Sequence, residues 1–432
     1  MTHWLLPDLT FDGTTLVPDL AVGIAGERIV AVVPGPQVPT DAPRTRLRGR
    51  ALLPGFVNAH SHAFQRGLRG HVQHAADPAS TDSFWTWRTT MYAQANALDP
   101  EGIGRVSALA FEEMLAAGFT TVGEFHYVHH QPDGTPYDDP DELALRVLDA
   151  ASRVGIRIVL LRVAYARAGF GVAPNPLQRR FLDPSPDHAL AAVARLRARG
   201  IAAGLAPHST RAVPADWLAE FGRADLDVPV HAHVDEQPAE IDASLAEHGV
   251  RPLHVYDRAG LLGPRFTAVH LTHPDAGELA LLRAQGAGVC ACPTTELDLG
   301  DGFLPLRDLD RDPAEGPPPV SIGTDSHALI DPFTELRSLE WHARAQAGRR
   351  NVLRHAPQAD GLAARLLRIG SEVGAAQLGV DAGSIAAGKL ADLVAIDLDH
   401  VSLRDTATLP AIVFSGSPAL VREVWVGGRK VR

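Results

Sequence analysis

The sequence predicts an α/β protein: a (β/α)8 barrel of the TIM type beside a small composite β-sandwich made from the two ends of the chain. Between residues 51 and about 330, eight short apolar or β-branched runs alternate with amphipathic helical patterns, several of which end in glycine. Eight such units predict a closed parallel barrel. Histidines and carboxylates follow many of the runs, and the carboxyl ends of the strands are the catalytic face of such barrels.

The eight expected strands are each bounded by glycine, proline or polar residues. They are LLPGFVNAHSH (52–62), TTVGEFHY (120–127), IRIVLLRVAY (156–165), IAAGLAPHST (201–210), DVPVHAHVDE (227–236), FTAVHLTH (266–273), GAGVCACPTTE (286–296) and PVSIGTDS (319–326). Helices around 332–380 are expected to complete the outer ring, so that the barrel domain spans residues 51–384.

The two termini carry short strand-like runs that do not make a comfortable sheet alone. Residues 1–50 and 385–432 are therefore expected to pair into the β-sandwich domain. The connection from 69 to 101, which contains DSFWTWR, exceeds ordinary loop length and is a candidate lid. Its tryptophans Trp85 and Trp87 are expected to pack the lid rather than to touch a ligand.

Composition restricts the function classes. With 432 residues, 45% hydrophobic and 21% charged, and no apolar run long enough for a bilayer, the chain is typical of a globular cytoplasmic protein. Its net charge of -11 argues against nucleic acid or an anionic membrane as partner. The two cysteines, Cys290 and Cys292, are interpreted as small core residues of one strand.

Two HxH motifs and one aspartate indicate a metal site. His60 and His62 share a face if a strand continues through them, and so do His231 and His233. A catalytic zinc site takes about three protein ligands and one open position. His60 and His62, one histidine of the second pair, and Asp325 of GTDSH would supply them. Spacing alone does not decide between His231 and His233.

The motifs NAHSH, HAHVDE, VHLTH and GTDS, in this order, resemble the amidohydrolase superfamily across the whole chain. Within it, SFWTWR, EFHYVHHQPDGTPY, YARAGFG and HSTRAV resemble the formimidoylglutamate deiminases. The resemblance implies one divalent metal per chain, Zn²⁺ above all, and a homodimer. It implies the metal ligands His60, His62, His233 and Asp325, and a proton-transfer set of Glu236, His270 and Asp325.

The same resemblance implies a small acidic substrate, N-formimidoyl-L-glutamate, hydrolysed to N-formyl-L-glutamate and ammonia by attack of an activated water on the formimidoyl carbon. Arginine suits bidentate recognition of carboxylates, so Arg88 and Arg211 are the candidates for the two carboxylates of this substrate. Gln65, Tyr127 and His208 would complete the polar contacts.

Three alternatives to a mononuclear formimidoyl hydrolase have to be considered. A metal pair bridged by a carboxylated lysine is excluded, because the fourth strand ends LAPHST and no lysine precedes Lys389; a bridge through Glu124 stays open. A deaminase of a ring such as guanine or cytosine would use the same metal and acid–base set, but its substrate lacks two carboxylates. A non-catalytic barrel would be expected to have lost ligands, and none is missing.

Overall fold

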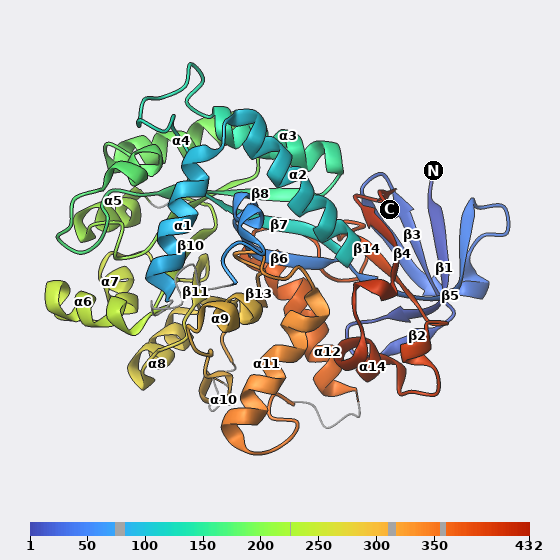
Figure 1. The fold of residues 1–432 in the computed structure, drawn as a ribbon. Coiled ribbons are helices and arrows are strands. Elements are labelled where there is room, and N and C mark those ends of the chain that lie inside the picture. The colour runs from blue at the N-terminus through green and yellow to red at the C-terminus, as the bar shows by residue number, and fades with distance from the viewer. Residues whose placement is uncertain (74–82, 225, 310–316, 355–359) are drawn as a thin grey trace.

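The fold is described from a computed structural model, over residues 1–73, 83–224, 226–309, 317–354 and 360–432. Within these ranges the strands form two separate eight-stranded sheets. Figure 1 shows one of them surrounded by helices and the other standing beside it, with both chain ends nearby. No helix in the described ranges combines the length and the apolar character that a membrane crossing requires.

The eight expected barrel strands are confirmed. They run parallel and in sequence order: β6 (Phe56–Ser61), β7 (Phe119–His126), β8 (Arg157–Ala164), β9 (Ala203–Pro207), β10 (Val230–Val234), β11 (Phe266–His270), β12 (Gly288–Ala291) and β13 (Val320–Ile322). A single parallel bridge between Ser61 and Asp325 joins the first strand to the segment after the last. The polar strand ends are thereby gathered around one opening.

Helices cover the outside of this barrel (Figure 1). Several begin at a capping side chain: Asp99, Ser185 and Asp275 each accept a backbone N–H of the first turn. Several end, as expected, at a left-handed glycine such as Gly118 or Gly286. The helices are α2 (Pro100–Ala117), α3 (Glu142–Val154), α4 (Pro186–Ala198), α5 (Ala215–Ala224), α6 (Pro238–His248), α7 (Pro252–Arg258), α8 (Ala276–Gln285), α9 (Pro293–Leu299), α10 (Leu306–Leu309), α11 (Pro332–Ala347), α12 (Gly361–Arg368) and α13 (Gly374–Gln377).

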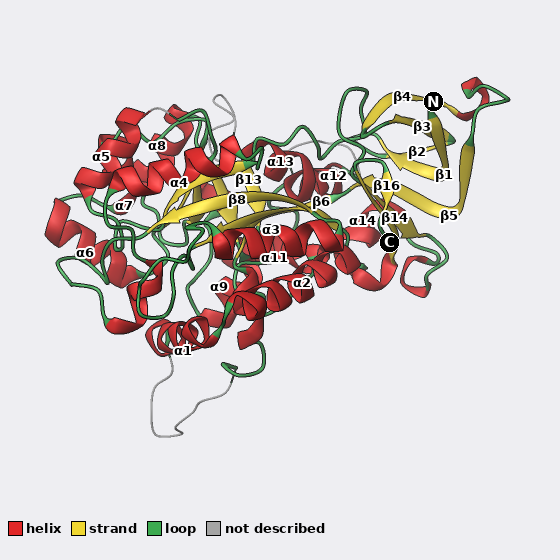
Figure 2. Cartoon of the chain, turned by 90° about the horizontal axis from the view of Figure 1, so that it is seen from above, coloured by secondary structure: helices red, strands yellow, loops and turns green. Residues whose placement is uncertain are grey.

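The termini build the second sheet together, which confirms the composite module. Its path is β16-β15-β14-β5-β1-β3-β4, with β2 paired to β1; Figure 2 shows it set to one side of the barrel. The strands are β1 (His3–Phe11), β2 (Leu16–Pro18), β3 (Leu20–Ala25), β4 (Arg28–Pro34), β5 (Arg44–Pro54), β14 (Leu393–Asp397), β15 (Val421–Val426) and β16 (Arg429–Lys430). Helix α14 (Thr408–Ser415) lies between β14 and β15 in the sequence. The domain boundaries at 50 and 385 stay a prediction.

One strand start is corrected. Residues 52–54 do not open the first barrel strand, because Leu52, Leu53 and Pro54 pair with β14 in the terminal sheet. The chain passes from one sheet to the other at Gly55, where an added Cβ would lie 2.2 Å from the Thr120 hydroxyl. Only glycine fits this crossing.

The described residues of the long connection after the first strand are mostly helical. It contains a 3-10 segment, η2 (Ala63–Leu68), and helix α1 (Phe84–Ala97); residues 74–82 of the proposed lid lie outside the described residues. A second 3-10 segment, η3 (Pro176–Phe181), holds α1 in place. Buried Arg180 donates to the carbonyls of Ala95 and Leu98, and Asn96 Nδ2 donates to the Leu177 carbonyl at 2.8 Å.

Candidate metal centre and active site

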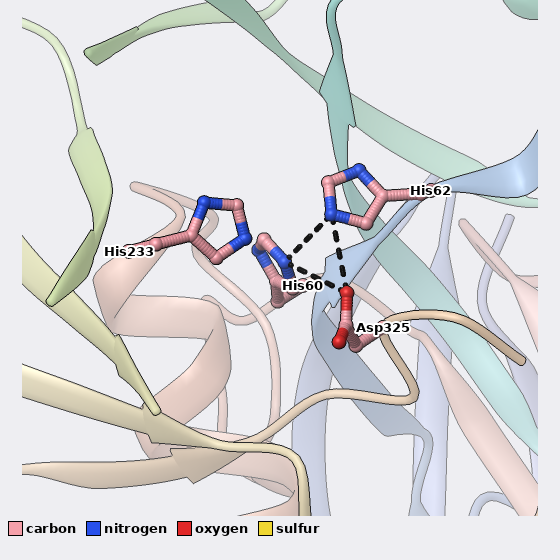
Figure 3. A group of neighbouring side chains, drawn as sticks. All are labelled: His60, His62, His233 and Asp325. Carbon is pink, nitrogen blue, oxygen red and sulfur yellow. Dashed lines mark hydrogen bonds and ion pairs between the residues drawn. The ribbon is translucent and has the colours of Figure 1, made fainter. Parts of the chain in front are cut away.

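Four buried side chains converge at the carboxyl ends of the barrel strands. The metal cluster consists of His60, His62, His233 and Asp325, whose ligand atoms all lie within 4.8 Å of one another. Asp325 Oδ1 is 3.3 Å from His60 Nε2 and 3.1 Å from His62 Nε2. His233, from β10, lies beside His60; in Figure 3 it is to the left of His60, and His62 and Asp325 are to the right. The ligand set expected from the resemblance is thus brought together.

Outer contacts fix how two of these rings present their nitrogens. His62 Nδ1 lies 2.9 Å from the Phe125 carbonyl, and His233 Nδ1 lies 2.9 Å from the His208 carbonyl. A carbonyl only accepts, so each Nδ1 carries a hydrogen and Nε2 is left as the ring nitrogen that can bind a metal. His231, in contrast, is bonded through Nε2 to the carbonyl of Gln377 at 3.3 Å and lies outside the cluster. The structure therefore separates the two histidines that spacing left open.

The electrostatics of the metal cluster suit a cation. Burial lowers the pKa of His60 well below its usual range and that of His233 to about 3, so both rings are neutral. Burial raises the pKa of Asp325, but its close contacts with the His60 and His62 rings hold this pKa well below its ordinary value. His60 Nε2 and His62 Nε2 are only 3.2 Å apart. Neutral nitrogens and a carboxylate gathered this closely are a donor set for Zn²⁺ or a similar ion.

His270 lies beside the metal cluster. Its Nδ1 is 3.3 Å from Glu296 Oε1, and its buried Nε2 has no hydrogen-bond partner; it lies 3.8 Å from Glu236 Oε1 and 3.9 Å from Asp325 Oδ2. Burial lowers the pKa of His270, but the bond to Glu296 and the charges of Glu236 and Asp325 raise it to about 10. The gap between these three side chains suits a small polar group such as water.

The backbone near the metal cluster is strained. Asp235, His270, Leu271, Asp325 and His327 all have positive φ angles although none is glycine, and they follow or end β10, β11 and β13. Such conformations persist where the surroundings over-determine them, and they gather at functional sites.

A pocket with about 500 Å³ of empty space opens above the metal cluster. Of the cluster, His62, His233 and Asp325 line it, and so does Glu236. All five residues expected to bind substrate also line it: Gln65, Arg88, Tyr127, His208 and Arg211. Helix α1 contributes much of one wall. Trp87 belongs to that wall and packs against the hydrophobic core, and Trp85 is 42% exposed.

Arg88 is held by neutral groups. Its Nε donates to the Tyr92 hydroxyl at 2.6 Å, and its Nη2 donates to the Tyr165 hydroxyl at 3.2 Å and to the Ala168 carbonyl at 3.0 Å. No carboxylate of the described residues pairs with it. The guanidinium therefore faces the pocket with its positive charge uncompensated.

Arg211 lies between the pocket and two carboxylates. Its Nη2 donates to Glu236 Oε2 at 2.7 Å, its Nε is 3.6 Å from Glu240 Oε1, and its Nη1 is buried without a hydrogen-bond partner. Burial raises the pKa of Glu236, but Arg211 and His270 lower it below its ordinary value. The guanidinium thus keeps Glu236 ionised and still has one nitrogen to offer a ligand.

The remaining predicted contacts, Gln65, Tyr127 and His208, lie next to one another in the pocket. Gln65 Nε2 donates to the Tyr127 hydroxyl at 2.7 Å, and Gln65 Oε1 is buried without a partner. His208 Nδ1 lies 3.1 Å from the Ser209 hydroxyl, and burial keeps the pKa of His208 well below its usual value. These groups are neutral and partly unsatisfied, which suits hydrogen bonding to a polar ligand.

Several other sequence interpretations are settled by contacts. Glu124 accepts from the Ser61 hydroxyl and the Ala63 N–H and lies outside the metal cluster, so a bridge through it has no support. His129 and His130 bond backbone carbonyls of Val163 and Leu182. Cys290 and Cys292 are free and buried, as expected.

Sequence reasoning missed the roles of Glu240, Tyr92, Tyr165 and Asp301. Asp301 is buried, and burial together with the charge of Glu236 raises its pKa to about 9. Glu240, Tyr92 and Asp301 lie in helices or loops, where spacing gave no signal, whereas Tyr165 had one, because it ends the third expected strand. Glu296 did have a signal, because it follows the seventh strand.

Comparison with known proteins agrees with this geometry. The Amidohydrolase family model matches residues 51–431. The formimidoylglutamate deiminase of Pseudomonas aeruginosa is 42% identical over 393 residues, which cover 89% of this chain and 85% of that protein.

Solved structures share the whole fold. A crystal structure of an amidohydrolase from Brucella melitensis has a TM-score of 0.87 and 33% identity, and covers 99% of this chain and 94% of its own. An adenosine deaminase from Xanthomonas campestris, with bound zinc, has a TM-score of 0.80 and 27% identity, with coverage of 99% and 92%. By its family match, its barrel and its His–His–His–Asp cluster, this chain belongs to the amidohydrolase family.

Proposed function

We propose that the protein hydrolyses N-formimidoyl-L-glutamate to N-formyl-L-glutamate and ammonia, as a step of histidine catabolism. The observation that carries the proposal is the pocket: it joins the metal cluster to two arginines, Arg88 and Arg211, one of which has no carboxylate partner among the described residues. A linear dicarboxylate with a reactive amidine at one end matches this distribution of charge. The 42% identity to a formimidoylglutamate deiminase supports the same substrate.

The metal expected is one divalent ion per chain, Zn²⁺, held by His60, His62, His233 and Asp325. Neutral imidazoles and a carboxylate are ligands typical of catalytic zinc, and the zinc bound to the Xanthomonas adenosine deaminase supports this choice. When bound, such an ion lowers the pKa of water towards neutrality and so supplies a nucleophile at physiological pH.

The reaction forms a C–O bond and breaks a C–N bond at one carbon. Water oxygen adds to the formimidoyl carbon, the terminal nitrogen gains protons and leaves as ammonia, and the carbon keeps the oxygen as the formyl group. We assign Asp325 to accepting one proton of the water and passing it towards the leaving nitrogen, and Glu236, which is ionised beside Arg211, to taking up the other proton and passing it to the imino nitrogen. His270, whose Nε2 faces both carboxylates, would orient the water and stabilise charge near it.

The proposed contacts with the substrate use the residues that line the pocket. Arg88 and Arg211 are proposed to hold substrate carboxylate, and Gln65, Tyr127 and His208 to hydrogen-bond the remaining polar atoms. We expect a cytoplasmic homodimer that binds neither nucleic acid nor membrane, in keeping with the charge of -11.

The test is ammonia release from N-formimidoyl-L-glutamate by purified protein of known metal content, run beside guanine, cytosine and adenosine, with the organic product weighed by mass spectrometry. Rapid formation of N-formyl-L-glutamate is expected. No release from this substrate by protein that carries metal would overturn the assignment, and release from a ring substrate would replace it with a ring deaminase.

A further inference from the structure

The surroundings of Arg88 contain more hydrogen-bond donors than acceptors. The Arg88 cluster consists of Arg88, Tyr92, Tyr165 and Gln178, of which the first three line the pocket and Gln178 is fully buried behind them. Gln178 Nε2 lies 3.1 Å from the Tyr92 hydroxyl and 2.9 Å from the Tyr165 hydroxyl. The orientation of this amide is fixed, because Gln178 Oε1 accepts the Asn175 N–H at 3.0 Å.

Each tyrosine oxygen therefore receives two hydrogens. Tyr92 accepts from Arg88 Nε and Gln178 Nε2, and Tyr165 accepts from Arg88 Nη2 and Gln178 Nε2. The two hydroxyls also contact one another at 2.9 Å. A hydroxyl oxygen accepts at most two hydrogen bonds, so at most one phenolic hydrogen is directed to the other oxygen, and at least one has no acceptor among the described residues.

A ligand in the pocket can supply an acceptor for the free phenolic hydrogen, because both tyrosines line the pocket. Arg88 and Gln178 donate to both oxygens and offer no acceptor there. Burial, with the neighbouring Tyr165, raises the pKa of Tyr92, so its hydroxyl stays protonated at neutral pH. Arg88 Nη1 likewise makes no hydrogen bond within the described part of the chain. A buried donor without an acceptor is unfavourable, and a carboxylate with several lone pairs relieves it.

We propose that the Tyr92–Tyr165 pair donates a hydroxyl hydrogen to the same substrate carboxylate that Arg88 binds. The tyrosines are then specificity-determining residues for a dicarboxylate rather than mere support for the arginine. This inference rests on the proposed function for the identity of the substrate. The chemistry recognised is a carboxylate on a short aliphatic chain, for which glutarate is a sufficient probe.

The pair also predicts an unusual mutational pattern. In Tyr92→Phe, the hydrogen of Tyr165 loses its partner and becomes the free donor; in Tyr165→Phe, the same holds for Tyr92. Each single variant keeps one donor, and only the double variant has none. The loss in the double variant should therefore exceed the product of the two single losses.

The experiment measures glutarate affinity by calorimetry and kcat/KM for N-formimidoyl-L-glutamate. The double variant Tyr92→Phe/Tyr165→Phe is expected to bind glutarate about 10- to 100-fold more weakly, the effect of a hydrogen bond to a charged group. Tyr256→Phe is the matched control, because the Tyr256 hydroxyl is buried without a hydrogen-bond partner; its affinity should match wild type. Melting curves for all variants check that the fold is intact.

The outcomes separate the two proposals. Wild-type protein that binds glutarate but releases no ammonia from the substrate would refute the proposed function and leave the tyrosine donor standing. A double variant that binds glutarate as tightly as wild type, or losses that simply multiply, would overturn the tyrosine donor whatever the substrate is.

Discussion

The metal cluster and the Arg88 cluster border one pocket, but the first lacks a cation and the second lacks a hydrogen-bond acceptor. Around Asp325, atoms that can bind a metal are gathered closely: His60 Nε2 and His62 Nε2 are 3.2 Å apart. Around Arg88, hydrogens face hydrogens, and the nearest acceptors are already used. Each cluster is incomplete on its own, because one requires a cation and the other an anion. The pocket is therefore matched to a ligand that is anionic at the end away from the metal.

Arg211 is the link between the two clusters. It pairs with Glu236, which lies near His270, while its Nη1 has no partner. The need of one cluster for a cation and the need of the other for an anion are therefore coupled, and variants of single residues can separate them.

The largest effect is expected at the metal cluster. His233→Asn should lower metal affinity by at least about 100-fold, since losing even an outer partner of a ligand costs about 10- to 100-fold. His231→Asn, two residues away on the same strand, should retain the metal. Metal content after dialysis, measured by atomic absorption, checks this pair. Equal losses in both variants would contradict the assignment of the ligands.

The next effect is expected at Arg88. Arg88→Met should raise KM for the substrate about 10- to 100-fold and change kcat less, because a charge-assisted bond to a carboxylate contributes roughly 1.5–3 kcal/mol. Arg105→Met, an exposed arginine on α2, is the control. Steady-state kinetics distinguish them, and an unchanged KM would remove Arg88 from the substrate site.

A smaller effect is expected at Arg211, through the pKa of Glu236. Burial raises the pKa of Glu236 and the Arg211 charge lowers it, so removing that charge must move the pKa up. If the ionised Glu236 is the working form, activity falls as pH drops through its pKa, and Arg211→Met should shift this acid limb of kcat/KM to higher pH. Arg211→Lys keeps the charge and should shift it less. Superimposable profiles for all three proteins would show that Arg211 does not tune Glu236.

The smallest effect is expected at Glu124, outside both clusters. Glu124→Gln should keep the metal-to-chain ratio of wild type and cost about 1 kcal/mol of unfolding free energy, the contribution of an ordinary hydrogen bond. Metal analysis and chemical denaturation measure the two quantities. A drop in bound metal would revive the carboxylate bridge.

The barrel and the metal cluster were predictable because they depend on simple periodicities. Alternation along a strand put His60 and His62 on one face, and parallel strands bring their carboxyl ends to one opening. The choice of His233 over His231 required more, since both share a face and differ only in depth along the barrel. The structure resolves it through the Gln377 carbonyl, which occupies His231.

Helix α1 was not recognised because a charged residue lies on its buried face. Its buried positions, Phe84, Met91, Tyr92 and Ala95, would form a regular apolar stripe, but Arg88 stands between Phe84 and Met91 on the same face. The arginine interrupts the apolar pattern by which a helix is recognised in a sequence. The Arg88 cluster as a whole also joins α1 to η3, segments more than 80 residues apart, and no local signal reports such a contact.

The bridge between Ser61 and Asp325 closes the barrel next to the metal cluster, so metal binding there depends on barrel closure. The ligands come from the first strand, the fifth strand and the segment after the eighth, so they meet only after the chain between residues 60 and 325 has folded and its ends have joined. A ligand set spread this widely has little affinity in an unfolded chain, and binding free energy adds to folding free energy. A bound ion would therefore hold the first and last strands of the barrel together, and its retention would show that the barrel is closed.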